Sequence, residues 1–120
     1  MQTAKQRLGT DGEQAAAAFL TGQHYEILDR NWRCPAGELD LVARAGNGQI
    51  TAIEVKTRSS QRYGSGFEAI SAAKFRRLNR LLISWAQCHR MFLAELRVDI
   101  VEVYLTATGF ECRLHENVRS

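Results

Sequence analysis

The sequence has few cysteines, a single proline and no long apolar run, and each shortage excludes a class of protein. Three cysteines without a Cys-x-x-Cys spacing argue against a disulfide framework and a zinc site, and they favour a reducing, cytoplasmic environment. One proline and nine glycines leave little room for low-complexity linkers. Because no stretch approaches the roughly 18 apolar residues of a membrane helix and the first residues are polar, we expect neither a membrane span nor a signal peptide.

Length and charge suit one globular domain with an acidic partner. A chain of 120 residues is long enough to bury roughly two-thirds of its unfolded surface, so we predict a single domain over residues 1–120. The net charge of +3 and the pI near 9.0 suit a polyanion such as a nucleic acid. The excess is nevertheless smaller than in proteins that bind nucleic acid by charge alone.

The segment Gly37–Arg58 has the pattern of a hairpin that carries acids where a core is expected. Because successive side chains of a strand point to opposite faces, Glu54 and Lys56 share one face, which Asp40 can reach from the neighbouring strand. Two carboxylates about 5 Å apart are a suitable seat for a hard divalent cation. Since an unpaired buried charge is costly, the three groups either neutralise one another or hold a ligand.

An Asp, a turn and then Glu-x-Lys on the next strand resemble the signature of the PD-(D/E)XK nucleases, carried here by Asp40, Glu54 and Lys56. More narrowly, the sequences Gly-Glu-Leu-Asp-Leu-Val from Gly37 and Glu-Val-Lys-Thr-Arg from Glu54 are similar to the YraN-like family of small bacterial proteins. The fold of that family is close to that of the archaeal Holliday-junction resolvases. The resemblance extends through Leu8-Gly9, Gly12-Glu13, Ala16, Asn31, Tyr63-Gly64, Lys74 and Arg97-Val98-Asp99.

Periodicity elsewhere predicts an α/β domain, and the resemblance implies that it has a restriction endonuclease-like core. Strong helix formers predict a helix over residues 10–21, and an apolar stripe predicts a second over residues 71–88. Alternation predicts strands over 25–32 and 96–105 and a short edge strand over 110–114, with a turn at 31–35 after the first. The order is then α-β-β-β-α-β(-β), a mixed sheet flanked by two helices.

The resemblance implies a metal-dependent endonuclease that hydrolyses phosphodiester bonds. Asp40 and Glu54, with the backbone carbonyl of Val55 and with Glu13, would bind one or two Mg²⁺ or Mn²⁺ ions. Lys56 would orient the attacking water or neutralise a phosphate oxygen. Helix geometry puts Glu13 at the margin of the face that meets the sheet. The alternative for Glu13 is a capping box with Thr10, which would leave it a purely local role.

Four further side chains are predicted to contact nucleic acid. Arg58 is followed by a Gly- and Ser-rich loop in which Arg62 and Tyr63 offer charge and one stacking surface, although this loop also suits a solvated connector. Lys74 stands in the first turn of a helix after Ser71, where the helix dipole disfavours a cation. We therefore predict that Lys74 contacts a phosphate.

Two other functions remain open at this point. In the first, the nuclease fold binds structured nucleic acid or a protein partner without catalysis. In the second, the acids and the lysine form a plain ion-pair cluster, which is less favoured because buried ion clusters are poor stabilisers. The expected substrate is DNA, branched or otherwise structured, with RNA as the second choice, and a symmetric junction would suit a homodimer.

Overall fold

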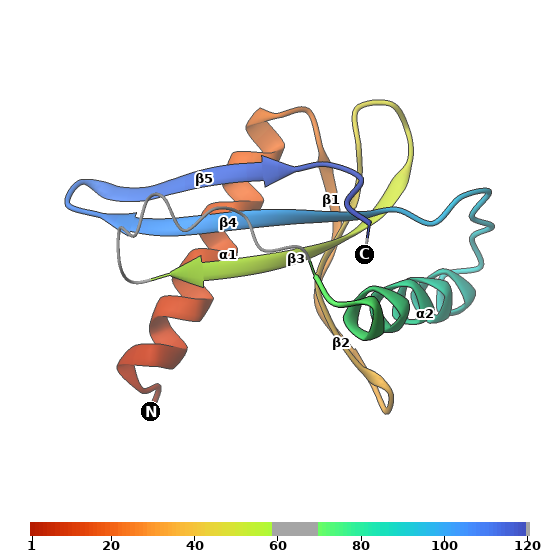
Figure 1. The fold of residues 1–120 in the computed structure, drawn as a ribbon, viewed down its shortest axis with the longest axis horizontal. Helices are drawn as coiled ribbons and strands as arrows, with labels where there is room; N and C mark the ends of the chain where they lie inside the picture. The colour runs from red at the N-terminus through yellow and green to blue at the C-terminus, as the bar shows by residue number, and fades with distance from the viewer. Residues whose placement is uncertain (59–69, 120) are drawn as a thin grey trace.

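A five-stranded mixed sheet with a helix on each face is the framework of the protein, seen in a computed structural model that describes residues 1–58 and 70–119 (Figure 1). The elements in chain order are α1 (Ala4–Gly22), β1 (Glu26–Cys34), β2 (Gly37–Arg44), β3 (Ile50–Arg58), α2 (Ala72–Cys88), β4 (Val98–Thr106) and β5 (Gly109–His115). The α/β class, the two helices and the predicted element order are confirmed, with the optional last strand present. Neither helix of the described part of the chain is long and apolar enough to cross a membrane.

The strands lie in the sheet in the order of the sequence, β1-β2-β3-β4-β5. Only the pair β3–β4 is parallel among the described strands, and α2 lies in the connection between these two strands. A parallel pair needs such a crossover, whereas the antiparallel pairs are joined by short turns. The predicted hairpin is β2–β3, which turns at Ala45–Gly48.

The central strands divide their apolar side chains between two hydrophobic cores. On the side of α2, Ala52 and Ile100 pack with Trp85 and other residues of that helix. On the side of α1, the next residues along the strands, Ile53 and Val101, pack with the helix. Because β3 and β4 are covered on both faces over much of their length, they read as nearly continuous apolar runs. A charged side chain on β3 therefore stands out.

Helix α1 begins well before the predicted start at residue 10. Its cap is Thr3, whose hydroxyl accepts from the amide of Gln6 at 3.1 Å, while the Gln6 side chain accepts from the Thr3 amide at 2.9 Å. Thr10 lies inside the helix and donates its hydroxyl to the Gln6 carbonyl at 3.0 Å. The predicted capping box of Thr10 and Glu13 is therefore wrong, and Glu13 is available for another role.

A close contact with the sheet supports the amino-terminal half of α1. A Cβ placed on Gly12 would lie 2.1 Å from Thr57 Oγ1, so only glycine lets the helix approach β3 this closely. The next turn continues the contact with Ala16, which is fully buried. Glycine weakens a helix locally, but tertiary packing here outweighs that preference.

Strand β1 runs past the predicted turn at residues 31–35 and ends at Cys34. Asn31 has a positive φ of 50°, yet pairing with β2 continues on both sides of it, from Arg30 to Trp32. The turn itself is formed by Pro35 and Ala36. The Asn31 side chain is thereby held at the point where β1 and β2 pass α1.

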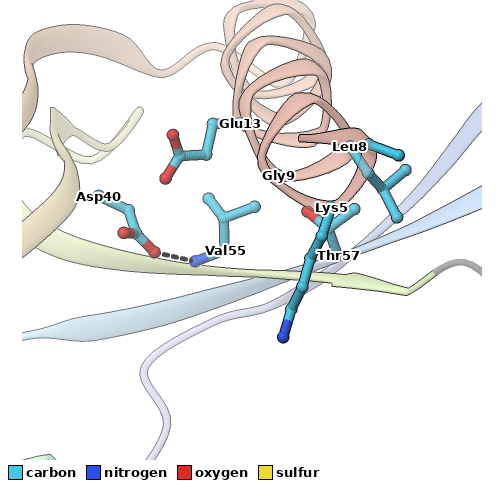
Figure 2. A pocket seen from close by; sticks show the side chains of 8 residues that line it. Lys5, Leu8, Gly9, Glu13, Asp40, Val55 and Thr57 are labelled. Carbon is cyan, nitrogen blue, oxygen red and sulfur yellow. Dashed lines mark hydrogen bonds between the residues drawn. The ribbon is translucent and has the colours of Figure 1, made fainter. Parts of the chain in front are cut away.

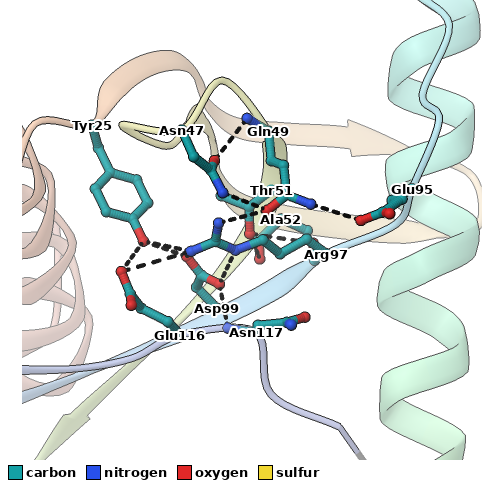
Figure 3. Close-up of polar contacts among 10 residues, drawn as sticks. All are labelled: Tyr25, Asn47, Gln49, Thr51, Ala52, Glu95, Arg97, Asp99, Glu116 and Asn117. Atoms are coloured by element: carbon teal, nitrogen blue, oxygen red, sulfur yellow. Dashed lines mark hydrogen bonds and ion pairs between the residues drawn. The ribbon is translucent and has the colours of Figure 1, made fainter.

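A buried polar network ties the carboxyl-terminal residues to the sheet (Figure 3). Asp99 is fully buried and accepts from Arg97 at 2.9 Å, from the Tyr25 hydroxyl at 2.6 Å and from the Asn117 amide at 2.8 Å. Glu116 accepts from the Tyr25 hydroxyl at 3.3 Å. Burial and the hydrogen bond to Asp99 raise the pKa of Tyr25 far above its usual value, so it stays neutral.

Candidate active site

The candidate site lies where β2 and β3 part. Residue pairing between the two strands ends at Leu41 and Ile53. Beyond that point the Asp40 carboxylate replaces a backbone partner, because its Oδ2 accepts from the Val55 amide at 2.9 Å (Figure 2). The amide and the carbonyl of a strand residue face the same neighbouring strand. The Val55 carbonyl therefore faces the same gap as Asp40.

Three carboxyl groups meet at this gap. Asp40 of β2 lies within hydrogen-bonding reach of Glu54 of β3 and of Glu13 of α1. Figure 2 shows Glu13 reaching from the helix toward Asp40. The predicted convergence of Asp40 and Glu54 is thus present, and Glu13 joins it from the helix.

The three acids disturb one another's protonation. Burial raises the pKa of Asp40 to about 8, and the hydrogen bond and charge of Glu54 act in the same direction, against the Val55 amide. Burial also raises the pKa of Glu13, with the charges of Glu38 and Glu54 acting in the same direction and the hydrogen bond with Asp40 opposing them. Burial is the largest cause of both pKa shifts, and repulsion between the neighbouring carboxylates adds to it. A bound cation would relieve this repulsion.

Two lysines were predicted near the acids, and the structure gives them different neighbours. Lys74 Nζ of α2 lies 2.5 Å from Glu54 Oε2, so this lysine, which was predicted to contact a phosphate, forms an ion pair with a site carboxylate. Lys56 is half-buried on β3 and stands beside Glu102 of β4 in the strand register. Glu54 thus has an ammonium partner from the second helix.

The remaining predicted contacts fall at or beyond the end of β3. Arg58 is half-exposed, and its Nε lies 3.7 Å from Oε2 of the buried Glu102. Arg62 and Tyr63 lie outside the described residues, so their predicted roles remain predictions. The side chain of Arg58 is therefore engaged on the sheet, on the face that carries Glu102.

Asn31 is a site residue to which sequence reasoning gave no role. When its amide nitrogen is oriented toward the acids, it donates to Glu13 Oε1 at 3.1 Å and to Glu38 Oε1 at 3.2 Å. The amide would hold the Glu13 carboxylate from the side opposite α1. The only local signal is an asparagine that tolerates a positive φ within a strand.

Two hollows open on either side of the acids. One, of about 620 Å³, is lined by residues including Lys5, Gly9, Glu13 and Asp40 (Figure 2). The other, of about 740 Å³, shares Gly9, Glu13 and Asp40 and extends to Arg33. Both have the size of pockets that take small molecules. Glu13 and Asp40 are thus accessible from two sides.

The donor atoms fit a hard divalent cation. Carboxylate oxygens of Glu13, Asp40 and Glu54 and the carbonyl oxygen of Val55 are ligands that Mg²⁺ and Mn²⁺ prefer. Within residues 1–58 and 70–119, no three His, Cys, Asp or Glu side chains stand in an arrangement that would hold an ion as they are. This agrees with the position of Glu54, which is drawn to Lys74. Side-chain rotation would be needed before an ion could bind.

Sequence comparisons identify a family and relatives that cover most of the chain. The model of a family described as Uncharacterised protein family UPF0102 matches residues 12–103. A UPF0102 protein of Paenarthrobacter aurescens is 51% identical over 100 residues, which are 83% of this chain and 82% of the relative. Relatives of the same name from Renibacterium salmoninarum and Symbiobacterium thermophilum are 50% and 45% identical, over 92% of this chain and 92% and 94% of their own lengths. The matched region contains all three acids.

Proposed function

The chain belongs to the UPF0102 family, the YraN-like family that its motifs resemble, and from the residues of its site we propose that it is a Mg²⁺- or Mn²⁺-dependent nuclease acting on DNA. The observation that carries the proposal is the meeting of Glu13, Asp40 and Glu54 at the parting of two strands. Carboxylates concentrated in this way suit metal-assisted hydrolysis of a phosphodiester.

In this proposal the three carboxylates and the Val55 carbonyl would hold the metal ion. When bound, the ion would supply a water of lowered pKa and stabilise the charge that develops on the phosphate. Asp40 is kept in place by the Val55 amide, which donates a hydrogen bond to its carboxylate at 2.9 Å. Asn31 restrains Glu13 through the hydrogen bond to Oε1. These contacts fix the direction of two of the carboxylates.

Two lysines supply positive charge. Lys56 lies two residues after Glu54 on the same face of β3, where its ammonium orients the attacking water or neutralises a phosphate oxygen. Lys74 neutralises Glu54 in the ion-free protein, and a metal ion would compete with it for that carboxylate. Once displaced, the Lys74 ammonium is next to the site and can take a substrate phosphate. The ion pair and the predicted phosphate contact then belong to two states of one side chain.

A binding module without catalysis is the second candidate. The observation that favours it is the Lys74–Glu54 ion pair, because a lysine that permanently occupies Glu54 would exclude a metal ion. The two candidates differ in a simple measurement. A ligand that binds the folded state raises the melting temperature, so a nuclease of this kind should show a Mg²⁺-dependent rise and a pure binder need not.

Cleavage assays test the proposal directly. The wild type and the variants Glu54→Ala and Lys56→Ala are incubated with Mg²⁺ or Mn²⁺ and with branched, single-stranded and duplex DNA and RNA. The control is Glu26→Ala, which removes an acid from an exposed ion pair with Arg44. We expect cleavage by the wild type and the control and a loss of about 100-fold or more in the two site variants. Equal residual cleavage by all four proteins would indicate contamination and refute the proposal.

The same assays, run at several protein concentrations, address the substrate and the predicted homodimer. A preference for four-way junctions with a steep dependence on protein concentration would support a symmetric pair of subunits. Cleavage of linear duplexes at a rate proportional to protein concentration would argue against both expectations.

A further inference from the structure

The two hollows adjoin along the amino-terminal half of α1 and are together called the groove. They share Gly9, Glu13 and Asp40, so these two acids lie at the middle of the groove rather than at its end. One end is bordered by Lys5 and the other by Arg33. Figure 2 shows Lys5 extending from the helix on the opposite side of Gly9 from Glu13. A cation therefore lies on each side of an acidic centre.

Gly9 keeps this groove open. A glycine inside a helix costs about 1 kcal/mol relative to alanine. Gly12 is required for packing on Thr57, but a Cβ on Gly9 would meet nothing within 4 Å. Packing therefore gives no reason for a glycine at position 9. Its physical effect is that no side chain projects from position 9 of α1 into the space beside Glu13 and Asp40.

The lining chemistry indicates which part of a ligand the groove would contact. Among the described residues, none that lines either hollow is aromatic, so these residues offer bases no stacking surface. Lys5 and Arg33 are exposed, and the Arg33 side chain is 76% exposed beside Glu38. Cations without aromatics suit the sugar-phosphate backbone, which carries no sequence information directly. Because each hollow has only the volume of a small-molecule pocket, a narrow single strand fits the groove better than a duplex does.

We propose that this groove is the binding track of one unpaired nucleic-acid strand, with Lys5 and Arg33 contacting phosphates on either side of the acids. The inference rests on the proposed nuclease function for the role of the acidic centre and adds to it the form of the substrate. Binding is independent of base sequence and weakens with salt. The strand passes Gly9 on its way across Glu13 and Asp40.

A matched pair of glycine substitutions tests the groove. Gly9→Gln adds a side chain of good helix propensity inside it, and Gly22→Gln adds the same side chain to the last residue of α1, where a Cβ also meets nothing within 4 Å. The readout is fluorescence anisotropy of a short labelled single-stranded oligonucleotide, in EDTA and with Ca²⁺. We expect Gly9→Gln to weaken binding at least tenfold with a melting temperature equal to or above that of the wild type. Gly22→Gln should bind as the wild type does.

Charge substitutions test the two ends of the groove. Lys5→Gln and Arg33→Gln should each weaken binding of every sequence to the same degree. Each should also reduce the slope of log Kd against log salt by about 0.7, the value for one phosphate contact on a single strand. If the salt dependence of Kd were unchanged in both variants, Lys5 and Arg33 would not contact phosphates and the proposed track would be wrong.

The outcomes separate this inference from the nuclease proposal. Wild-type-like binding by Gly9→Gln, or no binding of any single strand by the wild type, overturns the groove whatever the metal does. Loss of binding in Gly9→Gln alone, in a protein without a Mg²⁺-dependent rise in melting temperature and without cleavage, would support the groove and reject the nuclease. Cleavage with Mg²⁺ by a Gly9→Gln variant that binds and cleaves like the wild type would support the nuclease and reject the groove.

Discussion

Replacing Asp40 with asparagine should make the metal-free protein more stable, although it removes a residue of the proposed site. Burial and the neighbouring acids raise the pKa of Asp40 to about 8 from an ordinary value of 3.8. Between these values the folded state holds a proton that the unfolded chain releases. Stability of the wild type therefore falls as the pH rises through this window, since the unfolded state binds fewer protons. Asparagine abolishes this dependence because it does not titrate.

The magnitude follows from the size of the shift. One pH unit of such a difference is worth about 1.4 kcal/mol, so at pH 7 the penalty on the wild type has an upper bound of about 4 kcal/mol. Asp40 remains partly exposed, and asparagine keeps an oxygen that can accept from the Val55 amide. We therefore expect Asp40→Asn to raise the free energy of unfolding at pH 7 by about 1–3 kcal/mol. For a chain of this size this is a rise in melting temperature of roughly 3–12 °C.

Thermal unfolding in EDTA from pH 4 to pH 8 measures the effect. The stability difference between Asp40→Asn and the wild type should be near zero at pH 4 and grow toward pH 8. Asp11→Asn, which removes an exposed acid from α1, serves as the control and should show no such growth. Added Mg²⁺ should raise the melting temperature of the wild type and leave Asp40→Asn unchanged. An Asp40→Asn variant less stable than the wild type at pH 8 in EDTA would refute the electrostatic reasoning.

Two further substitutions test contacts away from the gap. Gly12→Ala should lower the free energy of unfolding by about 1–3 kcal/mol, because its Cβ would lie 2.1 Å from Thr57 Oγ1 and 2.9 Å from Thr57 Cβ. Thr57→Ala in the same chain should restore part of this loss, because it removes Oγ1 and keeps the close Cβ, as urea unfolding would measure. Burial raises the pKa of Glu102, but hydrogen bonds with Tyr104 and His115 outweigh it, so the pKa lies below its usual value and the carboxylate stabilises the fold above about pH 4.5. Glu102→Gln should therefore cost about 1–3 kcal/mol at pH 7 and much less at pH 3, and an equal cost at both would contradict the assignment.

The parts of the fold that local pattern determines could be predicted from the sequence. Alternation in the segment Gly37–Arg58 predicted the strands β2 and β3 with their turn, because successive residues of each strand point to the two hydrophobic cores in turn. The stripe of Leu78, Leu82 and Trp85 gave α2, with Ser71 as its cap. In both segments the local pattern and the tertiary packing agree.

The errors in element boundaries occur where packing overrides local preference. The first turns of α1 are polar and contain Gly9 and Gly12, which favour a later helix start, yet the contact of Gly12 with Thr57 holds this part of the helix on the sheet. Likewise, Asn31 and Pro35 suggest an early turn, whereas pairing with β2 keeps β1 extended through a residue with positive φ. Neither contact is visible in a local window of sequence.

At the candidate site, spacing within the hairpin predicted that Asp40 and Glu54 meet, and helix geometry predicted that Glu13 approaches them, but the other partners from outside the hairpin were missed or assigned differently. Asp40 and Glu54 are close because neighbouring strands enforce it. The ion pair of Lys74 with Glu54 joins residues twenty positions apart through the packing of α2, so no periodicity predicts it. Asn31 was likewise missed as a partner of Glu13, because its position depends on how β1 passes the helix.

The tie between the last residues and the start of β4 has a consequence during synthesis. The Asn117 amide bonds to Asp99, and the Val118 amide bonds to the Val98 carbonyl at 2.8 Å, so β4 has its full set of partners only when this tail is free to fold back. Both helices and the central strands leave the ribosome earlier, and the acids of the gap can come together before the tail arrives. A nascent chain stalled at this stage would carry an assembled acidic gap on an unfinished sheet, in the state most exposed to proteases and aggregation.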